Sequence, residues 1–217
     1  MINLLKTVYN LQIFKNLRNY LKTKKDISQT TGQINPDTEE GKLIYSFIMN
    51  NQLQNILDIG TWNGLGSTKT VIDAIISKKE TVNFISLEAD KLAFKQAKKN
   101  LSKYEDYVNL IYGRIVDVSE MPDISTIEFE KFGFEQKNSE WFYQDIRRYK
   151  KTKNILNSLT TNFDFVIFDG GEFTTYSEFK KLWKNTKYVG LDDIYSYKQY
   201  KVLKFIEANP HCFNLID

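Results

Sequence analysis

The chain has 217 residues, of which 41% are hydrophobic and 26% are charged, so a disordered chain is excluded and one domain with a full core is expected. The formal net charge of +3 and the short basic run at 147–153 favour a solvated helix face and argue against a nucleic-acid partner. A single cysteine, Cys212, excludes an intramolecular disulfide and a metal cluster built on several thiolates.

Apolar residues recur at helical spacing near the N-terminus and predict an amphipathic helix over residues 2–23. Lys6 and Lys15 interrupt its apolar residues, so the segment lacks both a signal-peptide core and the roughly 20 apolar residues of a membrane span. We therefore expect a cytoplasmic protein without a membrane span. The apolar face of this helix either packs on its own domain or joins two copies of the chain in a homodimer.

A turn-rich segment at 30–38 precedes the next predicted helix, for which Asp37 or Thr38 can serve as the N-cap. Five short apolar runs follow, at 55–59, 83–87, 108–112, 163–168 and 187–191, with helical stretches at 67–77, 89–101 and 197–208. Strands that alternate with helices predict an α/β fold, here a Rossmann-like, largely parallel sheet with helices on both faces. We assign residues 1–36 to the N-terminal helix and its lead-in loop, and residues 37–217 to the α/β domain.

Residues 114–161 form a long stretch between the third and fourth predicted strands, without a clear period and longer than a crossover needs. Long insertions in compact domains often serve binding, so we expect an insertion on the acceptor side. Its aromatic residues either contact a substrate or fill a core, and these residues are Phe132, Phe134, Trp141, Phe142 and Tyr143.

A glycine-rich loop follows the first predicted strand and reads Asp-Ile-Gly-Thr-Trp-Asn-Gly-Leu-Gly-Ser over residues 58–67. Glycines let the backbone turn sharply, and the bare N–H groups of the next helix can then face a ligand. Glu88 ends the second predicted strand, where an acid suits the hydroxyls of a ribose. The spacing differs from the nicotinamide fingerprint, because Lys69 stands where its third glycine would be.

The loop resembles the first motif of class I S-adenosylmethionine-dependent methyltransferases, which is an acid, any residue, glycine, three residues, glycine, any residue and glycine. The resemblance covers about residues 40–217. It implies S-adenosylmethionine as cofactor, a methyltransferase activity, and a cofactor site made of Asp58, Gly60, Thr61, Trp62, Asn63, Gly64, Gly66, Ser67, Glu88 and Asp169.

The later segments resemble the O-methyltransferase branch that modifies sugars, glycans and related small molecules. In that branch, acids after the fourth and fifth strands flank the acceptor, and here Asp169, Asp192 and Asp193 match them. Their oxygens would suit Mg²⁺ or another divalent cation, although Asp192 or Asp193 could instead cap a helix. Asp169, Glu172 and Asp193 are the candidates for accepting the acceptor's proton, and Lys198 is a further candidate for contacting the acceptor.

Three functions remain open at this point. The resemblance favours O-methylation of a small-molecule or glycan acceptor, most of all a hydroxyl of a sugar or glycan precursor, with a phenolic small molecule as the rival. A non-catalytic scaffold that only binds S-adenosylmethionine is the alternative from another class. Methylation of a nucleobase is disfavoured, because Asp169 is followed by two glycines and Glu172 instead of the Pro-Pro-aromatic sequence of such enzymes.

Overall fold

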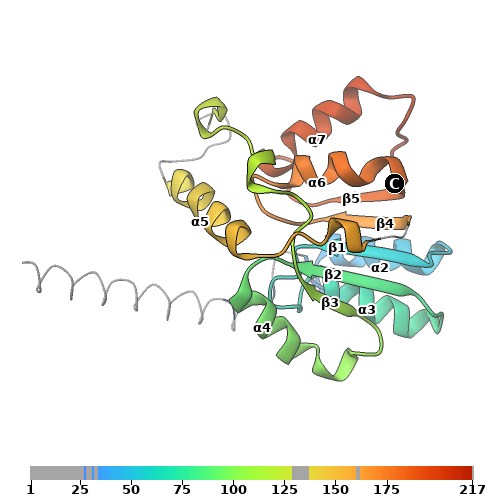
Figure 1. Cartoon of the computed structure of the whole chain (residues 1–217). Coiled ribbons are helices and arrows are strands. Elements are labelled where there is room, and N and C mark those ends of the chain that lie inside the picture. Colours follow the sequence, from blue (N-terminus) through green and yellow to red (C-terminus); the bar gives the residue numbers. More distant parts are fainter. Residues whose placement is uncertain (1–26, 28–30, 32–33, 129–136, 160–161, 217) are drawn as a thin grey trace, which may run out of the picture.

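A five-stranded parallel sheet forms the centre of the computed structural model, which describes residues 27, 31, 34–128, 137–159 and 162–216 (Figure 1). The strand order is β3-β2-β1-β4-β5. The strands are β1 (Asn55–Ile59), β2 (Asn83–Glu88), β3 (Asn109–Tyr112), β4 (Phe163–Phe168) and β5 (Thr186–Leu191). The predicted Rossmann-like α/β fold is therefore confirmed, and the strand order reverses its direction between β1 and β4.

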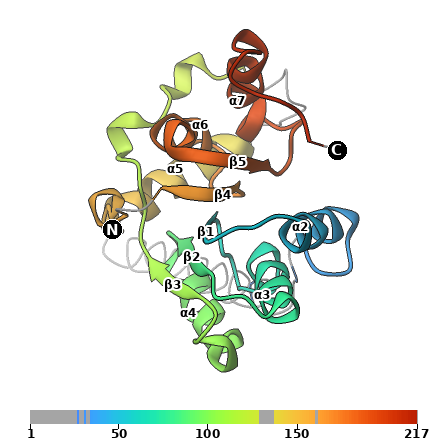
Figure 2. The ribbon, with the colours of Figure 1, turned by 90° about the vertical axis from the view of Figure 1, so that its right-hand side faces the viewer.

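Helices cover both faces of this sheet (Figure 2). They are α2 (Glu39–Asn50), α3 (Ser67–Lys78), α4 (Lys91–Asn100), α5 (Lys137–Lys151), α6 (Thr175–Leu182) and α7 (Tyr197–Ala208). Short 3-10 helices lie at Ser102–Tyr104, Val118–Glu120, Ile124–Thr126, Leu156–Ser158 and Trp183–Asn185. A sheet covered on both faces buries nearly all residues of its central strands, which explains why apolar residues predominate in β1 and β4.

Two apolar clusters fill the space between the sheet and its helices. Ile48 of α2 and Ile72 of α3 pack with Ile56 of β1 in one cluster. In the other, Phe179 of α6 and Val202 of α7 pack on the opposite sheet face. Side chains of β1 enter both clusters, because successive residues of a strand point to opposite faces.

Polar caps fix where two of the helices begin. The Thr38 hydroxyl accepts a hydrogen bond from the Gly41 N–H at 3.2 Å, which confirms one of the two predicted caps of α2. Asp90 caps α4 by accepting from the N–H groups of Leu92 and Ala93 at 2.8 and 3.0 Å. Asp90 thus begins α4 two residues after Glu88, the last residue of β2.

The insertion at 114–161 is more regular than the sequence predicts, because α5 forms a helix of 15 residues within it. Phe142 is buried against Phe173, whereas Trp141 and Tyr143 are about half exposed. Phe132 and Phe134 lie outside the described residues, as does the helix predicted at 2–23 with the homodimer contact proposed for it. Within the described part of the chain, no helix has the length and apolar character needed to cross a membrane.

Replacing Phe179 by alanine is expected to destabilise the fold by about 3 to 5 kcal/mol, because it removes a fully buried ring and leaves a cavity. The ring lies 5.7 Å from that of Phe168 and 5.6 Å from that of Phe205, measured between centroids. Urea denaturation followed by circular dichroism measures the effect. Leu43→Ala is the control, since Leu43 is 66% exposed, and a loss for Phe179→Ala no larger than that of the control would contradict the proposed packing.

Candidate functional site

The polar residues predicted from the sequence gather at the carboxyl ends of the strands, where the strand order reverses. A cavity of about 230 Å³ opens there between the loops after β1, β2 and β4. Crevices at this place are the usual ligand sites of open parallel sheets. The residues that line this cavity, called here the strand-end cavity, are Ile59, Gly60, Trp62, Leu87, Glu88, Ala89, Asp90, Gly113, Arg114, Ile115, Asp145, Arg148, Tyr149, Asp169, Gly170, Gly171 and Glu178.

The glycine-rich loop forms one wall of the strand-end cavity through a close approach of two backbones. Gly60 has a φ of +107°, and a Cβ atom on it would lie 2.1 Å from the carbonyl oxygen of Asp169. Gly64 also has a positive φ, of +82°. Only glycine accommodates both the torsion angle and the contact at position 60, so the loop needs that residue there.

Asp58 braces the loop from inside and does not line the strand-end cavity. Its carboxylate is fully buried and accepts hydrogen bonds from the hydroxyls of Ser67, Thr68 and Ser86 at 2.6 to 3.2 Å. Burial raises the pKa of Asp58, while these hydroxyls oppose the rise. Asp58 thus ties the end of β1 to the first turn of α3 and to β2.

The predicted cofactor residues divide into two groups. Those in the cavity wall are Gly60, Trp62, Glu88 and Asp169. Those that support the wall from behind are Asp58, Thr61, Asn63, Gly64, Gly66 and Ser67. In this second group, Thr61 bonds to Ser86 at 2.6 Å, and the Asn63 amide donates to the Ile27 carbonyl at 2.8 Å.

Glu88 presents a carboxylate at the cavity that two backbone N–H groups hold in place. Its Oε2 accepts from the Trp62 N–H and its Oε1 from the Asp90 N–H, both at 2.6 Å. The side chain is 92% buried, and burial raises its pKa to about 7 against the lowering effect of these N–H groups. Each carboxylate oxygen keeps a lone pair, so Glu88 can accept further hydrogen bonds from a ligand.

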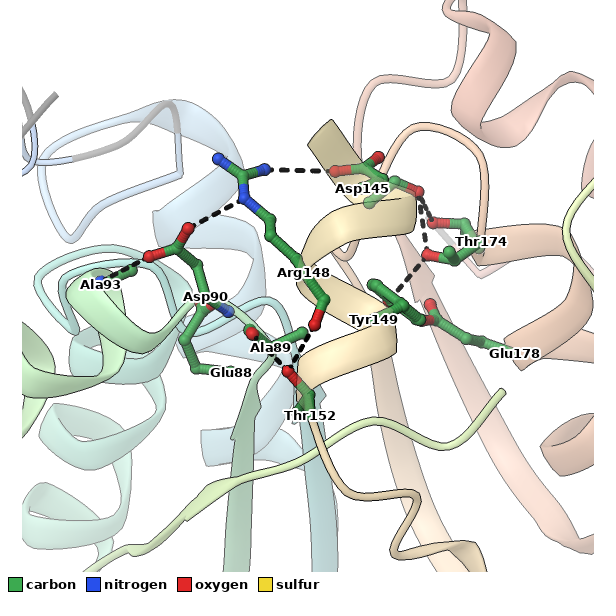
Figure 3. A network of polar contacts seen from close by, with 12 residues as sticks. Glu88, Ala89, Asp90, Ala93, Asp145, Arg148, Tyr149, Thr152, Thr174 and Glu178 are labelled. Carbon is green, nitrogen blue, oxygen red and sulfur yellow. Dashed lines mark hydrogen bonds and ion pairs between the residues drawn. The ribbon is translucent and has the colours of Figure 1, made fainter. Parts of the chain in front are cut away.

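Helix α5 lies over the strand-end cavity and contributes to its lining (Figure 3). The sequence did not predict this helix or its contribution to the cavity. The Arg148 guanidinium binds the Asp90 carboxylate at 2.8 Å and the Asp145 carboxylate at 3.1 Å. The Thr152 hydroxyl donates to the Ala89 carbonyl at 2.9 Å. Asp145, Arg148 and Thr152 recur at helical spacing, so this polar stripe could have been recognised in the sequence.

On its other side α5 is attached to α6 through buried groups. The Tyr149 hydroxyl lies 2.8 Å from Glu178 Oε1 and 2.9 Å from the Thr174 hydroxyl (Figure 3). Glu178 Oε2 is buried and has no hydrogen-bond partner among the described residues. Burial raises the pKa of Glu178 to about 7 and that of Asp145 to about 6.

The three acids after β4 and β5 do come together, but a lysine lies among them. The Lys198 ammonium is 2.6 Å from Asp169 Oδ1, 3.0 Å from Asp192 Oδ2 and 3.6 Å from Asp193 Oδ2. Glu172 joins the group because its Oε1 accepts from the Lys198 backbone N–H at 3.0 Å. We call these five residues the acid–lysine cluster.

Burial of the acid–lysine cluster perturbs its pKa values. Burial raises the pKa of Asp169 well above its ordinary value, Lys198 opposes the rise, and Asp192 adds to it. For Asp192, burial is outweighed by Asp169 and Lys198, so its pKa is lowered. The pKa of Lys198 is raised, because the attraction of Asp169 and Asp192 exceeds the effect of burial.

The predicted divalent-cation site made of Asp169, Asp192 and Asp193 is not confirmed. A divalent cation needs oxygen ligands at about 2.0 to 2.6 Å, and the Lys198 ammonium lies where the three carboxylates would provide them. Among the described residues, no group of three His, Cys, Asp or Glu side chains has an arrangement that could hold a metal ion. The cluster as folded therefore does not fit the cation.

A second cavity, of about 200 Å³, opens on the other side of the acid–lysine cluster and is called here the outer cavity. Asp169 lines the strand-end cavity, and its partner Lys198 lines the outer cavity. One member of this ion pair therefore lines each cavity. The residues lining the outer cavity are Glu120, Pro122, Glu172, Phe173, Tyr176, Ser177, Lys180, Tyr197, Lys198 and Lys201.

Solved structures with this fold include O-methyltransferases. The O-methyltransferase from Bacillus cereus in complex with SAH has a TM-score of 0.54 and 15% identity, covering 91% of this chain and 79% of its own. The O-methyltransferase of tomaymycin synthesis from Streptomyces achromogenes, in complex with SAM, has a TM-score of 0.51 and 18% identity, covering 79% and 68%. At this identity the likeness establishes the fold. No family model and no curated protein sequence matches the chain.

The free energy of unfolding is expected to fall as the pH rises from about 4.5 to about 7. Glu88 and Glu178 have pKa values of about 7 in the folded chain, so the folded state keeps protons that the unfolded chain releases near pH 4.5. The stability they contribute is complete below the unfolded pKa and is lost as the pH passes the folded one. Urea denaturation at several pH values measures this dependence.

Glu178→Gln should flatten that pH dependence by up to about 3 kcal/mol, since a shift of one pKa unit corresponds to about 1.4 kcal/mol. Glutamine keeps the size of the side chain and removes the titration. The control is Glu207→Gln, because Glu207 is exposed at the end of α7. An unchanged pH dependence in Glu178→Gln would show that this carboxyl is already ionised in the folded chain at acid pH.

Proposed function

We propose that the chain is an S-adenosylmethionine-dependent O-methyltransferase. The observation that carries this proposal is the buried carboxylate of Glu88, held by two backbone N–H groups at a strand-end cavity that the glycine-rich loop also lines. The fold shared with O-methyltransferases supports the same conclusion. Because proteins of one fold can carry out different chemistry, the proposal rests on the residues of the site.

Two features of the strand-end cavity suit the cofactor. Glu88 can accept hydrogen bonds from both hydroxyls of a ribose, because its backbone partners leave one lone pair on each oxygen. Gly60 allows the glycine-rich loop to approach the backbone of Asp169 closely, and both residues line the cavity. When bound, S-adenosylmethionine supplies a methyl group that its sulfonium already activates.

The outer cavity is the proposed place of the acceptor. It adjoins the strand-end cavity at Asp169 and Lys198, so an acceptor hydroxyl there could face the methyl group. The hydroxyl must lose a proton as the new bond forms, and a carboxylate can accept it. Glu172 is the best placed of the three candidate bases, because it lines the outer cavity while Asp169 is bound by Lys198 and Asp193 lies outside the lining.

A sugar or glycan hydroxyl is the leading proposal for the acceptor. Phe173, Tyr176 and Tyr197 line the outer cavity, and their rings can pack on the apolar face of a sugar. The same rings would also pack on a phenol, so a phenolic small molecule is the second candidate. A panel of hydroxylated sugars and phenols, assayed for transfer of a labelled methyl group, distinguishes the two acceptors.

Calorimetric titration with S-adenosylhomocysteine tests the cofactor site. Saturable binding is expected, and Glu88→Ala should weaken it at least tenfold, because a hydrogen bond to a charged group contributes about 1.5 to 3 kcal/mol. Glu105→Ala is the matched control, since Glu105 is exposed and lies far from the strand-end cavity. A folded wild type that does not bind would overturn the proposal, and binding without turnover on the whole panel would favour the scaffold alternative.

The affinity for S-adenosylhomocysteine should also rise with pH between about 6 and 8. Glu88 has a pKa of about 7 in the free chain, and its ionised form is the better acceptor for two hydroxyls. Glu88→Gln should bind more weakly and lose this pH dependence, while Glu105→Gln should keep it. If Glu88→Gln retained the full pH dependence, another group would be responsible for it.

A further inference from the structure

Lys198 stands where the three strand-end acids would otherwise share a cation. Its side chain is 94% buried and reaches back from the first turn of α7 to the ends of β4 and β5. Its ammonium binds Asp169 and Asp192 at 2.6 and 3.0 Å. The contact to Asp193 at 3.6 Å is an ion pair, longer than a hydrogen bond.

The backbone of α7 holds Lys198 firmly in this position. Glu172 accepts from the Lys198 N–H at 3.0 Å at the start of the helix. The side chain of the next residue, Gln199, is fully buried and donates to the Phe168 carbonyl at the end of β4 at 2.8 Å. Both contacts tie the first turn of α7 to the strand ends, so the ammonium is positioned by rigid elements.

One N–H of the ammonium remains for a ligand. An ammonium group has three N–H donors, and Asp169 and Asp192 accept two of them. Lys198 also lines the outer cavity, where the proposed acceptor would lie. The third donor is therefore left for an oxygen atom that enters the outer cavity next to Lys198.

We propose that Lys198 takes the place of a divalent cation in this enzyme, donating its third N–H to the acceptor oxygen so that methyl transfer needs no metal. This inference rests on the proposed O-methyltransferase activity. The oxygen lone pair forms the new bond to the methyl carbon as the sulfur–methyl bond breaks and its electron pair returns to sulfur. The hydroxyl proton passes to the Glu172 carboxylate, and Lys198 keeps its own protons throughout.

Manganese binding tests the position of the ammonium without any need for turnover. Electron paramagnetic resonance should detect no tightly bound Mn²⁺ in the wild type. Lys198→Ala removes the ammonium and should bind one Mn²⁺ per chain, which the further change Asp192→Asn should abolish. Lys204→Ala, an exposed position on the same helix, should behave as the wild type. Tight Mn²⁺ binding by the wild type that depends on Asp192 would overturn the proposal.

Turnover tests the role of the third donor. A chelator should leave wild-type activity unchanged, and Lys198→Ala should lower kcat about 100-fold with little change in the affinity for S-adenosylhomocysteine. Millimolar Mg²⁺ should restore part of the activity of Lys198→Ala, which loss of packing alone would not allow. A wild type that the chelator inactivates and Mg²⁺ restores would overturn the inference.

The two proposals fail in different ways. Absence of cofactor binding by the folded wild type contradicts the O-methyltransferase proposal, whatever Mn²⁺ does. Normal cofactor binding and turnover together with chelator sensitivity contradict only the assignment of Lys198. A Lys198→Ala chain that binds the cofactor as the wild type does and keeps full kcat likewise contradicts the assignment alone, since the ammonium would then have no part in methyl transfer.

Discussion

The close approach of Gly60 to the backbone of Asp169 is the contact on which the candidate site depends. It joins the loops after β1 and β4, the two neighbouring strands between which the strand order reverses. Past this contact the chain runs to α3 on one sheet face and to α6 on the other. The strand-end cavity lies where the loops part, and five acidic residues are among those that line it.

Charge is distributed unevenly around this contact. Glu88, Asp145 and Glu178 are buried carboxyls with raised pKa values on the side of the strand-end cavity. On the side of the outer cavity, one lysine compensates several acids. Burying so many acids costs stability at neutral pH, and such costs concentrate at functional sites, where ligands can recover part of them.

Helix α5 connects the two halves of the sheet above the strand-end cavity. Arg148 ties it to Asp90 after β2, and Tyr149 ties it to Glu178 of α6 (Figure 3). The helix thereby closes a side of the site that the strands leave open. The residues that line the strand-end cavity run from Ile59 to Glu178, which are 119 positions apart along the chain, and the fold alone brings them together.

The sequence by itself determined the strands, the helices that alternate with them and the glycine-rich loop. Apolar periodicity, caps and glycine spacing are local properties of the chain. It also located Glu88 and the acids Asp169 and Asp192, since strand ends can be recognised one strand at a time. Only the tertiary structure decided that Asp58 supports the loop from inside, and that the ammonium of Lys198 lies among the acids. Both outcomes depend on which side chains from separate elements share a buried space, and no local pattern encodes that choice.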